Sequence, residues 1–179
     1  MRSIRSPRRP FVIGLLFCAL SGCYTLDASL DRDGSGSLTL DYIPPLHATI
    51  DSETARYSSP HITVQSVSPR RGGATLKATF DDVTQLSGAE AFKDLTVVRD
   101  RKRGQERLRI RMRNPAPKQI RENAADDPRV TLTLPGRVLQ ANASARIEGN
   151  RVSWRLPLNE WARSPVTELK VRYRVAPPA

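Results

Sequence analysis

The sequence predicts an α+β domain in which hairpins form an antiparallel sheet and two or three short helices pack on one face of it. Three observations lead to this fold class. Apolar and polar residues alternate with period two in several short runs, which is typical of half-buried strands. Turn-forming residues separate most of these runs. Two other stretches carry weak helical signals, and the length of 179 residues suits a single domain.

Residues 1–22 are typical of a secretory signal peptide. Arginines at positions 2, 5, 8 and 9 precede an uncharged apolar run at 11–20, which is too short to span a bilayer as a helix. The run ends in LSGC at positions 20–23, which resembles the lipobox of bacterial lipoproteins. That resemblance implies cleavage between Gly22 and Cys23 and acylation of Cys23, which would become the lipid anchor. The alternative is an ordinary signal peptide followed by a chance cysteine.

The signal indicates the expected location but leaves open the export route and the type of cell envelope. The arginine pair at positions 8 and 9 keeps twin-arginine export beside the general secretory route. Tyr24, rather than Asp, follows Cys23, and in enteric-type bacteria that pattern implies passage to the outer membrane. We therefore expect an exported, membrane-anchored protein. It would face the periplasm from the outer membrane of a diderm cell, or lie on the outer face of the cell membrane otherwise.

Processing also changes the charge and the thiol content. The whole chain carries a formal net charge of +11. Removal of residues 1–22 takes away four arginines and no acid, so the mature chain would have 157 residues and a charge of +7. An exported location argues against nucleic acid as the partner of these charges. With Cys18 cut away and Cys23 acylated, no disulfide is expected. We expect one domain at 23–176 and a short tail at 177–179.

The first predicted hairpin joins alternating runs at 24–31 and 37–43. The residues Asp33-Gly34-Ser35-Gly36 between them form a strong turn signal. Leu30 and Leu38 face the same way if they are cross-strand partners. That register implies a three-residue loop with a glycine in the left-handed region.

The same turn partly matches a calcium-binding EF-hand loop. Asp31, Asp33, Ser35 and Gly36 occupy positions 1, 3, 5 and 6 of such a loop. Position 12, which needs a bidentate Glu, is Tyr42, and the following residues alternate with period two. A plain hairpin turn is therefore favoured, with calcium binding as the alternative.

The middle of the chain combines the weak helical signals with further strands. A helical stripe covers 46–57, and strands are expected at 61–68 and 74–82. The capping-box pattern at 87–90 predicts a short helix that ends near position 94. Residues 95–100 and 106–113 predict another hairpin, and a Pro-, Asn- and Asp-rich excursion follows at 115–128.

The C-terminal third predicts the most specific register. Gly149-Asn150 suits a two-residue hairpin turn. That turn pairs Ile147 with Val152, Ala145 with Trp154 and Ala143 with Leu156, so that one face is wholly apolar. A last strand is expected at 166–175, and Trp161 lies on the connection before it.

Two segments resemble the LppM-like domain of bacterial lipoproteins. The segments are TLPGRV at 133–138, in which Pro135-Gly136 suits a type II turn, and EGNRVSW at 148–154. A hairpin with a D-G-x-G turn after a lipobox is similar as well, so the resemblance covers about residues 24–175. It implies an α+β fold similar to lipid-binding domains, in an envelope module that recognises lipid or glycolipid. Many members continue into a C-terminal membrane helix, whereas this sequence stops at position 179.

No catalytic arrangement is visible, and we expect neither enzyme activity nor a cofactor or metal. The two histidines, His47 and His61, lie near predicted segment ends. There is no nucleophile elbow, phosphate-binding loop or dinucleotide fingerprint. The adjacent carboxylates at 81–82 and 126–127 would point in opposite directions in a strand and suit turns better.

Basic residues occupy the polar positions of three predicted strands. If these strands share one sheet with a common buried face, nine basic side chains share its other face. That face would bind an anionic lipid, glycolipid or envelope polymer. The alternatives are a merely solvated face and a structural or assembly lipoprotein that binds another envelope protein. The nine residues are Arg107, Arg109, Arg111, Arg113, Arg151, Arg155, Lys170, Arg172 and Arg174.

Overall fold

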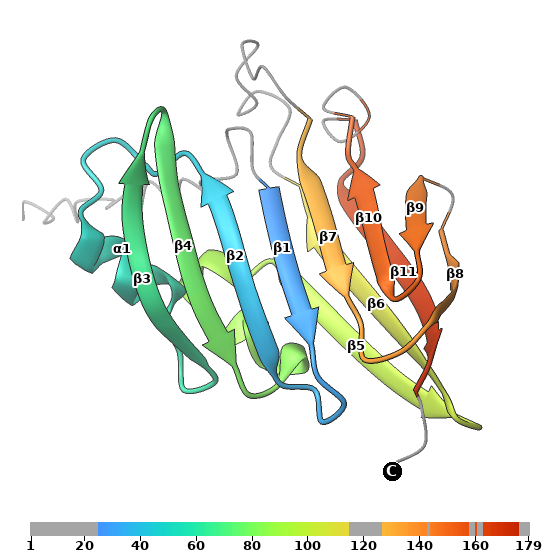
Figure 1. Cartoon of the computed structure of the whole chain (residues 1–179). Helices are drawn as coiled ribbons and strands as arrows, with labels where there is room; N and C mark the ends of the chain where they lie inside the picture. Colours follow the sequence, from blue (N-terminus) through green and yellow to red (C-terminus); the bar gives the residue numbers. More distant parts are fainter. Residues whose placement is uncertain (1–24, 115–126, 143, 158–159, 161–162, 176–179) are drawn as a thin grey trace, which may run out of the picture.

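The computed structural model describes residues 25–114, 127–142, 144–157, 160 and 163–175, which fold into two β-sheets packed face to face (Figure 1). Sheet A has seven strands in the order β3-β4-β2-β1-β7-β10-β9, and sheet B has four in the order β5-β6-β11-β8. The strands are β1 (Thr25–Leu30), β2 (Gly36–Tyr42), β3 (Ile62–Arg70), β4 (Gly73–Phe80), β5 (Leu95–Lys102), β6 (Gln105–Arg113), β7 (Arg129–Thr133), β8 (Val138–Ala141), β9 (Ala145–Glu148), β10 (Arg151–Arg155) and β11 (Val166–Arg174).

Neighbouring strands are antiparallel in both sheets, except that β1 and β7 are parallel. Figure 1 shows sheet B behind the β1, β7 and β10 side of sheet A. The described helices are α1 (Ile50–Tyr57) and the 3₁₀ helices η1 (Val83–Gly88) and η2 (Glu90–Phe92). The helix α1 packs against β3 and η2, while η1 packs against β5. The core therefore lies between the two sheets and beneath these short helices.

Alternation along each strand fills this core. Leu38, Leu40 and Tyr42 of β2 point inward and are buried, while the residues between them stay partly or fully exposed. Leu76 and Val152 have no exposed surface at all. Full burial of an aliphatic side chain of this size stabilises the fold by about 1.5–3 kcal/mol.

The predicted α+β class is wrong, because the described chain is mainly β. The stripe at 46–57 yields a helix of only eight residues, since the capping box of Thr49 and Ser52 starts α1 at Ile50. The helix predicted from the 87–90 pattern is replaced by η1 and η2. Asp82, not Ser87, caps this region, by accepting a hydrogen bond from the backbone N–H of Thr84. The backbone N–H groups of Ala89 and Phe92 donate to Leu86 O and Ala89 O, three residues back, so this connection from β4 to β5 forms 3₁₀ turns instead of an α-helix.

The first hairpin has the predicted faces but a different register. Leu30 pairs with Gly36 and Ala28 with Leu38, so the loop spans the five residues 31–35. Gly34 adopts the expected left-handed conformation with φ +105°. A Cβ at Gly36 would lie 2.0 Å from the carbonyl oxygen of Ser29, so glycine allows the two strands to approach at this pair. The shift is two residues, and the inward faces are therefore unchanged.

The C-terminal hairpin confirms the predicted register. Ile147 pairs with Val152 and Ala145 with Trp154 across β9 and β10. The predicted partner of Leu156, at position 143, lies outside the described residues, as do Trp161 and most of the 115–128 excursion. Ile147 remains 43% exposed because β9 is the edge strand of sheet A.

The TLPGRV segment carries the chain from β7 in sheet A to β8 in sheet B. The backbone N–H of Leu134 donates to Asn150 O at 2.9 Å, and that of Val138 donates to Gly149 O at 3.0 Å. The backbone N–H of Arg174 donates to Arg137 O at 2.9 Å. Leu134–Val138 thus binds the β9–β10 turn on one side and the end of β11 on the other.

Glycine is required at position 136 for space rather than for dihedral freedom. The predicted type II turn is wrong, because Gly136 does not have the positive φ that such a turn needs. Instead, a Cβ at this position would lie 1.7 Å from the carbonyl oxygen of Arg174. Gly136 therefore allows the backbones of this turn and β11 to touch.

Asn142 holds the return crossing from β8 to β9. Its Oδ1 accepts hydrogen bonds from the Trp154 indole N–H at 2.9 Å and from the Lys170 backbone N–H at 3.0 Å. Its Nδ2 donates to Glu168 O at 2.9 Å. Trp154 is 1% exposed, so this bond also satisfies a buried donor. One side chain thus connects β10 of sheet A with β11 of sheet B.

The replacement Gly136→Ala should destabilise the protein by about 2 kcal/mol or more, because the backbone of β11 must move away from the added methyl group. Gly88→Ala is the matched control, since its Cβ would meet nothing closer than Ser59 at 3.6 Å. The control should change the free energy of unfolding by less than about 1 kcal/mol. Urea denaturation of both variants measures the difference, and equal effects would contradict this account of the turn.

Candidate functional site

The outward face of sheet B gathers seven of the nine predicted basic residues. The register pairs Arg107 with Arg172 and Arg109 with Lys170, so these four side chains stand in two adjacent rows. Lys102 of β5 joins the same face, because it pairs with Gln105 beside Arg174. We call this set the basic face: Lys102, Arg107, Arg109, Arg111, Arg113, Lys170, Arg172 and Arg174.

The basic face carries eight basic side chains against two acids on the same side of these strands, Glu168 of β11 and Asp100, which pairs with Arg107 in the register. Its ion pairs centre on Glu168, whose carboxylate lies 2.6 Å from Lys170 Nζ and 3.3 Å from Arg109 Nε. The hydrogen bond from Lys170 lowers the pKa of the Glu168 carboxyl, and the charges of Lys170 and Arg109 act in the same direction. Arg107 and Arg172 form no ion pair with another described residue. The ion pairs of Glu168 with Lys170 and Arg109 are exposed, and exposed ion pairs contribute little to stability. The basic side chains of this face are therefore available to a ligand.

Two hollows flank the Arg107–Arg172 pair. One, of about 330 Å³, is lined by Arg107, Arg109, Gln140, Ala141, Asn142, Lys170, Val171 and Arg172. The other, of about 410 Å³, is lined by Asp100, Lys102, Arg103, Gln105, Glu106, Arg107 and Arg172. Arg172 Nε is buried and has no hydrogen-bond partner among the described residues. Two neighbouring guanidinium groups can each donate a pair of parallel hydrogen bonds to the oxygens of a phosphate or carboxylate group.

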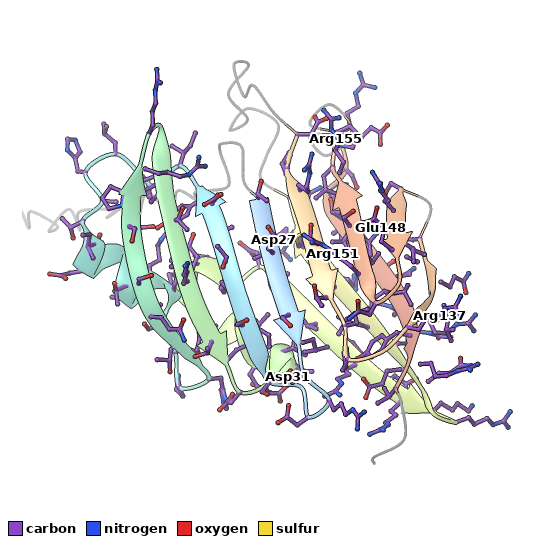
Figure 2. All side chains as sticks on the ribbon, viewed as in Figure 1. Asp27, Asp31, Arg137, Glu148, Arg151 and Arg155 are labelled. Carbon is purple, nitrogen blue, oxygen red and sulfur yellow. The ribbon has the colours of Figure 1, made fainter. Side chains whose placement is uncertain are left out.

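Arg151 and Arg155 do not belong to the basic face. They lie on β10, which is a strand of sheet A, so the expectation that all nine residues share one face is wrong. Arg151 binds Asp27 at 3.1 Å and Arg155 binds Asp127 at 2.8 Å. Figure 2 shows Asp27 and Arg151 together on the outer face of sheet A. The two arginines therefore serve as partners of acids on the opposite side of the molecule.

Sequence reasoning missed several residues of this site, and three of them show why. Lys102, Gln140 and Asn142 reach it from β5 and from the end of β8, and β8 was not predicted. The strand β8 has only four residues, and the chain enters sheet B just before it and returns to sheet A just after it. Four residues are too few for a recognisable alternation of apolar and polar positions. The basic run at 101–103 can be recognised in the sequence. Which of its side chains lie on the outward face depends on the β5–β6 register, which the sequence does not specify.

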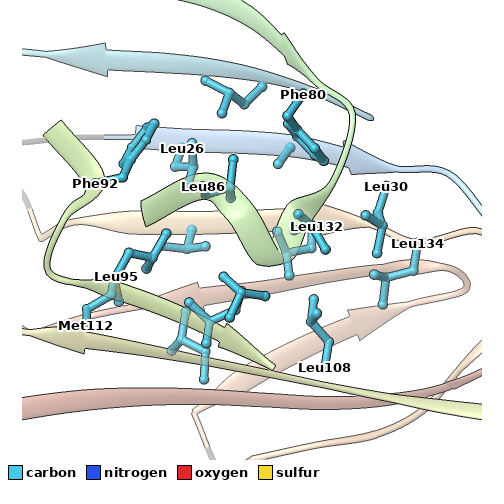
Figure 3. Close-up of a pocket in the computed structure, with 17 residues that line it drawn as sticks. Leu26, Leu30, Phe80, Leu86, Phe92, Leu95, Leu108, Met112, Leu132 and Leu134 are labelled. Atoms are coloured by element: carbon cyan, nitrogen blue, oxygen red, sulfur yellow. The ribbon is translucent and has the colours of Figure 1, made fainter. Parts of the chain in front are cut away.

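An apolar cavity of about 60 Å³ lies between the two sheets (Figure 3). At one end its lining residues Leu26, Phe92 and Met112 are only partly buried, while Leu108 and Leu134 at the other end are 1% exposed. A dry cavity of roughly 150 Å³ takes up benzene. The cavity of this structure is smaller, and an acyl chain would enter only if lining side chains moved.

A buried polar cluster closes the other end of the sandwich. Glu106, 2% exposed, accepts hydrogen bonds from Arg99 at 2.9 and 3.1 Å and one from the Tyr173 hydroxyl. Arg99 also donates to the Arg32 carbonyl oxygen in the β1–β2 turn at 2.5 Å. Burial alone would lower the pKa of Arg99, but the hydrogen bond and the charge of Glu106 outweigh it and raise that pKa. Burial and Glu106 together raise the pKa of Tyr173.

Cys23 and Gly22, the predicted anchor and cleavage residues, lie outside the described residues. In the part of the chain that is described, no helix is long and apolar enough to cross a membrane. No group of three or more potential metal ligands gathers there either. In the turn that partly matches an EF-hand, the Asp33 carboxylate accepts hydrogen bonds from the backbone N–H and hydroxyl of Ser35 at 2.9 and 2.7 Å.

The structure is similar to the NMR structure of the folded domain of LppM from Mycobacterium tuberculosis, with a TM-score of 0.51. The similarity covers 88% of this chain and 93% of that chain at 18% sequence identity. The resemblance expected from the TLPGRV and EGNRVSW segments is thus confirmed at the level of the fold. No family model and no curated protein matches the sequence.

The stability of the protein should fall as the pH rises above about 10. An unfolded tyrosine ionises near that pH. Burial raises the pKa of Tyr42, Tyr57 and Tyr173 in the folded state. The folded chain keeps protons that the unfolded chain loses, so the free energy of unfolding decreases with pH in this range.

Urea midpoints between pH 9 and 11.5, with absorbance at 295 nm to follow tyrosine ionisation, test this decrease in stability. Tyr173→Phe should make the decrease shallower, and an unchanged pH dependence in that variant would contradict the contribution of Tyr173.

Proposed function

We propose that this protein is an exported lipoprotein, anchored through acylated Cys23, whose basic face binds an anionic ligand of the cell envelope. The observation that carries the proposal is the alignment of Arg107, Arg109, Lys170 and Arg172 in two adjacent rows beside two hollows. The chemistry that these groups recognise is a phosphate or carboxylate group. Anionic lipids, glycolipids and envelope polymers all present such groups.

The anchor part of the proposal is supported by the signal peptide and by the fold. The apolar run at 11–20 leads into the lipobox-like LSGC segment at 20–23. The domain that follows resembles the folded domain of a protein named LppM. Two or three acyl chains on one N-terminal cysteine would give stable membrane attachment, whereas one chain gives marginal binding. On this basis the protein would face the periplasm from the outer membrane of a diderm cell, or lie on the outer face of the cell membrane otherwise.

Electrostatics sets the expected strength of binding. Each basic side chain near an anionic membrane surface contributes about 1 kcal/mol. The attraction is screened over about 10 Å at 0.1 M salt, so binding should weaken as the salt concentration rises. A merely solvated face, the alternative reading, would show neither affinity for a phosphate-bearing ligand nor dependence on particular arginines.

The proposal includes no catalytic activity. The nearest arrangement to a catalytic pair is His61 Nδ1 with Asp81 Oδ1 at 3.0 Å, and their side chains are 43% and 66% exposed. Catalytic groups usually gain their strength in sites that exclude water. The rival role, binding another protein by strand addition, meets hindrance at the edges of sheet A. The edge strand β3 contains a register shift and Pro69, and β9 has only four residues.

Charge reversal on the basic face should abolish most of the ligand affinity. The double variant Arg107→Glu/Arg172→Glu is expected to bind phosphatidylglycerol vesicles at least roughly 30-fold more weakly, from about 2 kcal/mol of lost attraction. Arg146→Glu/Arg151→Glu is the matched control, because it makes the same change of net charge on the outward side of sheet A. Vesicle co-sedimentation and titration with a soluble polyphosphate separate a lipid source of phosphate from a polymer. An equal loss in both double variants would mean that only the net charge matters.

Replacement of the predicted anchor residue should release the protein from membranes. Cys23→Ala is expected to abolish labelling with a radioactive fatty acid and to move the protein to the soluble fraction. Cys18→Ala, within the predicted signal, should change neither result. Membrane fractionation and acyl labelling of the two variants check this, and a Cys23→Ala protein that stays labelled and membrane-bound would rule out the anchor.

A further inference from the structure

An exposed apolar segment follows β2. Ile43, Leu46 and Ile50 are 39%, 86% and 53% exposed. They are three of the five large hydrophobic residues that are exposed in the described part of the chain. We call 43–50 the apolar loop. Single exposed apolar residues need no explanation, but a cluster of them on a short segment marks an interaction site.

The apolar loop has a defined conformation. Pro44 and Pro45 restrict its backbone, and the Ala48 N–H donates to the Pro45 carbonyl oxygen at 3.1 Å. His47 has φ +69°, which is uncommon for a residue other than glycine. Thr49 caps α1 at the end of the segment. Leu46 is therefore exposed to solvent on a turn with a defined backbone conformation.

The sheet register places the apolar loop beside the start of the domain. Thr25, the first residue of β1, pairs with Asp41 near the end of β2. Ile43 lies two residues beyond Asp41, at the same end of these strands. Only Tyr24 separates Thr25 from Cys23 in the sequence, so the backbone between them can span at most two residue lengths, roughly 7 Å. Figure 1 shows the start of β1, the end of β2 and the tip between β3 and β4 at one end of the sandwich.

Four arginines lie at this end, and two of them have acid partners: Arg70 Nε lies 3.7 Å from Asp41 Oδ1, and Arg155 Nε lies 2.8 Å from Asp127 Oδ2. Arg70 and Arg71 form the tip between β3 and β4, where Arg70 pairs with Gly73. Arg129 pairs with Thr25 on the other side of β1, and Arg155 pairs with Arg129. Figure 2 shows Arg155 at this end. Exposed apolar side chains at the same end of the sandwich as several arginines are complementary to the interface of an anionic bilayer, where apolar groups insert and arginines meet head groups.

We propose that the apolar loop is a second contact with the membrane that holds the anchor. The loop inserts Leu46, with Ile43 and Ile50, into the interface beside the acylated Cys23, while Arg70 and Arg71 contact anionic head groups. This inference rests on the proposed lipid anchor. Contact at the strand ends makes the sandwich stand on the bilayer. The basic face then stands clear of the membrane that holds the anchor, and it stays open to anionic groups of other envelope components or of a separate membrane such as added vesicles.

Site-specific fluorescence in the intact lipoprotein tests this contact. With Cys18 removed and Cys23 acylated, Leu46→Cys supplies the only free thiol of the mature chain, and it can carry an environment-sensitive fluorophore. The matched control is Val98→Cys, because Val98 is also an exposed apolar residue, 48% exposed, and lies on the outward face of sheet B. Both proteins are reconstituted in phosphatidylglycerol–phosphatidylcholine vesicles that contain brominated acyl chains.

The expected result is a blue-shifted emission at position 46 and at least twofold stronger quenching there than at position 98. Equal quenching at the two positions, or stronger quenching at 98, would overturn the proposed orientation. Flotation of the same samples separates this inference from the anchor. A protein that does not float with the vesicles contradicts the proposed lipid anchor. A protein that floats but shows no quenching at position 46 contradicts only the contact of the apolar loop.

Discussion

Burial of the inner side of sheet B against sheet A is the constraint on which the basic face depends. Leu108 and Ile110 of β6 and Leu169 and Val171 of β11 point into the core, where they are 1–9% exposed. Successive residues of a strand point to opposite sides, so the residues between them must point outward. Those residues are almost all Arg or Lys. The hydrophobic core thus decides where the positive charge gathers, and the antiparallel pairing of β6 with β11 brings Arg107 next to Arg172.

The relative placement of the two sheets comes from contacts at three points. The Leu134–Val138 turn binds the β9–β10 turn and the end of β11, and Gly136 allows the close approach. Asn142 joins Trp154 of sheet A to the backbone of β11. The Arg99–Glu106 pair reaches the β1–β2 turn through Arg32 O. Loss of one partner from a buried pair of this kind typically costs about 3–5 kcal/mol, because the other charge stays buried and uncompensated. The cluster also closes one end of the core, so the partly exposed end is the one where β1 begins.

Local patterns in the sequence predicted faces and hairpins well, and they failed where non-local pairing decides the outcome. The Gly149-Asn150 turn set the register of β9 and β10, and the alternation at 106–113 correctly separated arginines from core residues. The same alternation cannot say to which sheet a strand belongs. Arg151 and Arg155 alternate as clearly as Arg109 and Arg111, yet β10 pairs with β7 in sheet A. The parallel pairing of β1 with β7 joins residues about a hundred positions apart and leaves no local signal. The helices were overestimated because capping residues mark where a helix starts but not how long it continues.

The central claim is that the outward side of sheet B is the ligand-binding surface, and the arginine side chains themselves can report this. NMR titration of the protein with short polyphosphate, observed at the arginine Nε–H resonances, measures each guanidinium separately. We expect the resonances of Arg107, Arg109 and Arg172 to shift in a saturable manner. Those of Arg151 and Arg155, which are held by Asp27 and Asp127 on sheet A, should not shift. Uniform shifts of all arginines, or saturable shifts confined to Arg151 and Arg155, would contradict the claim.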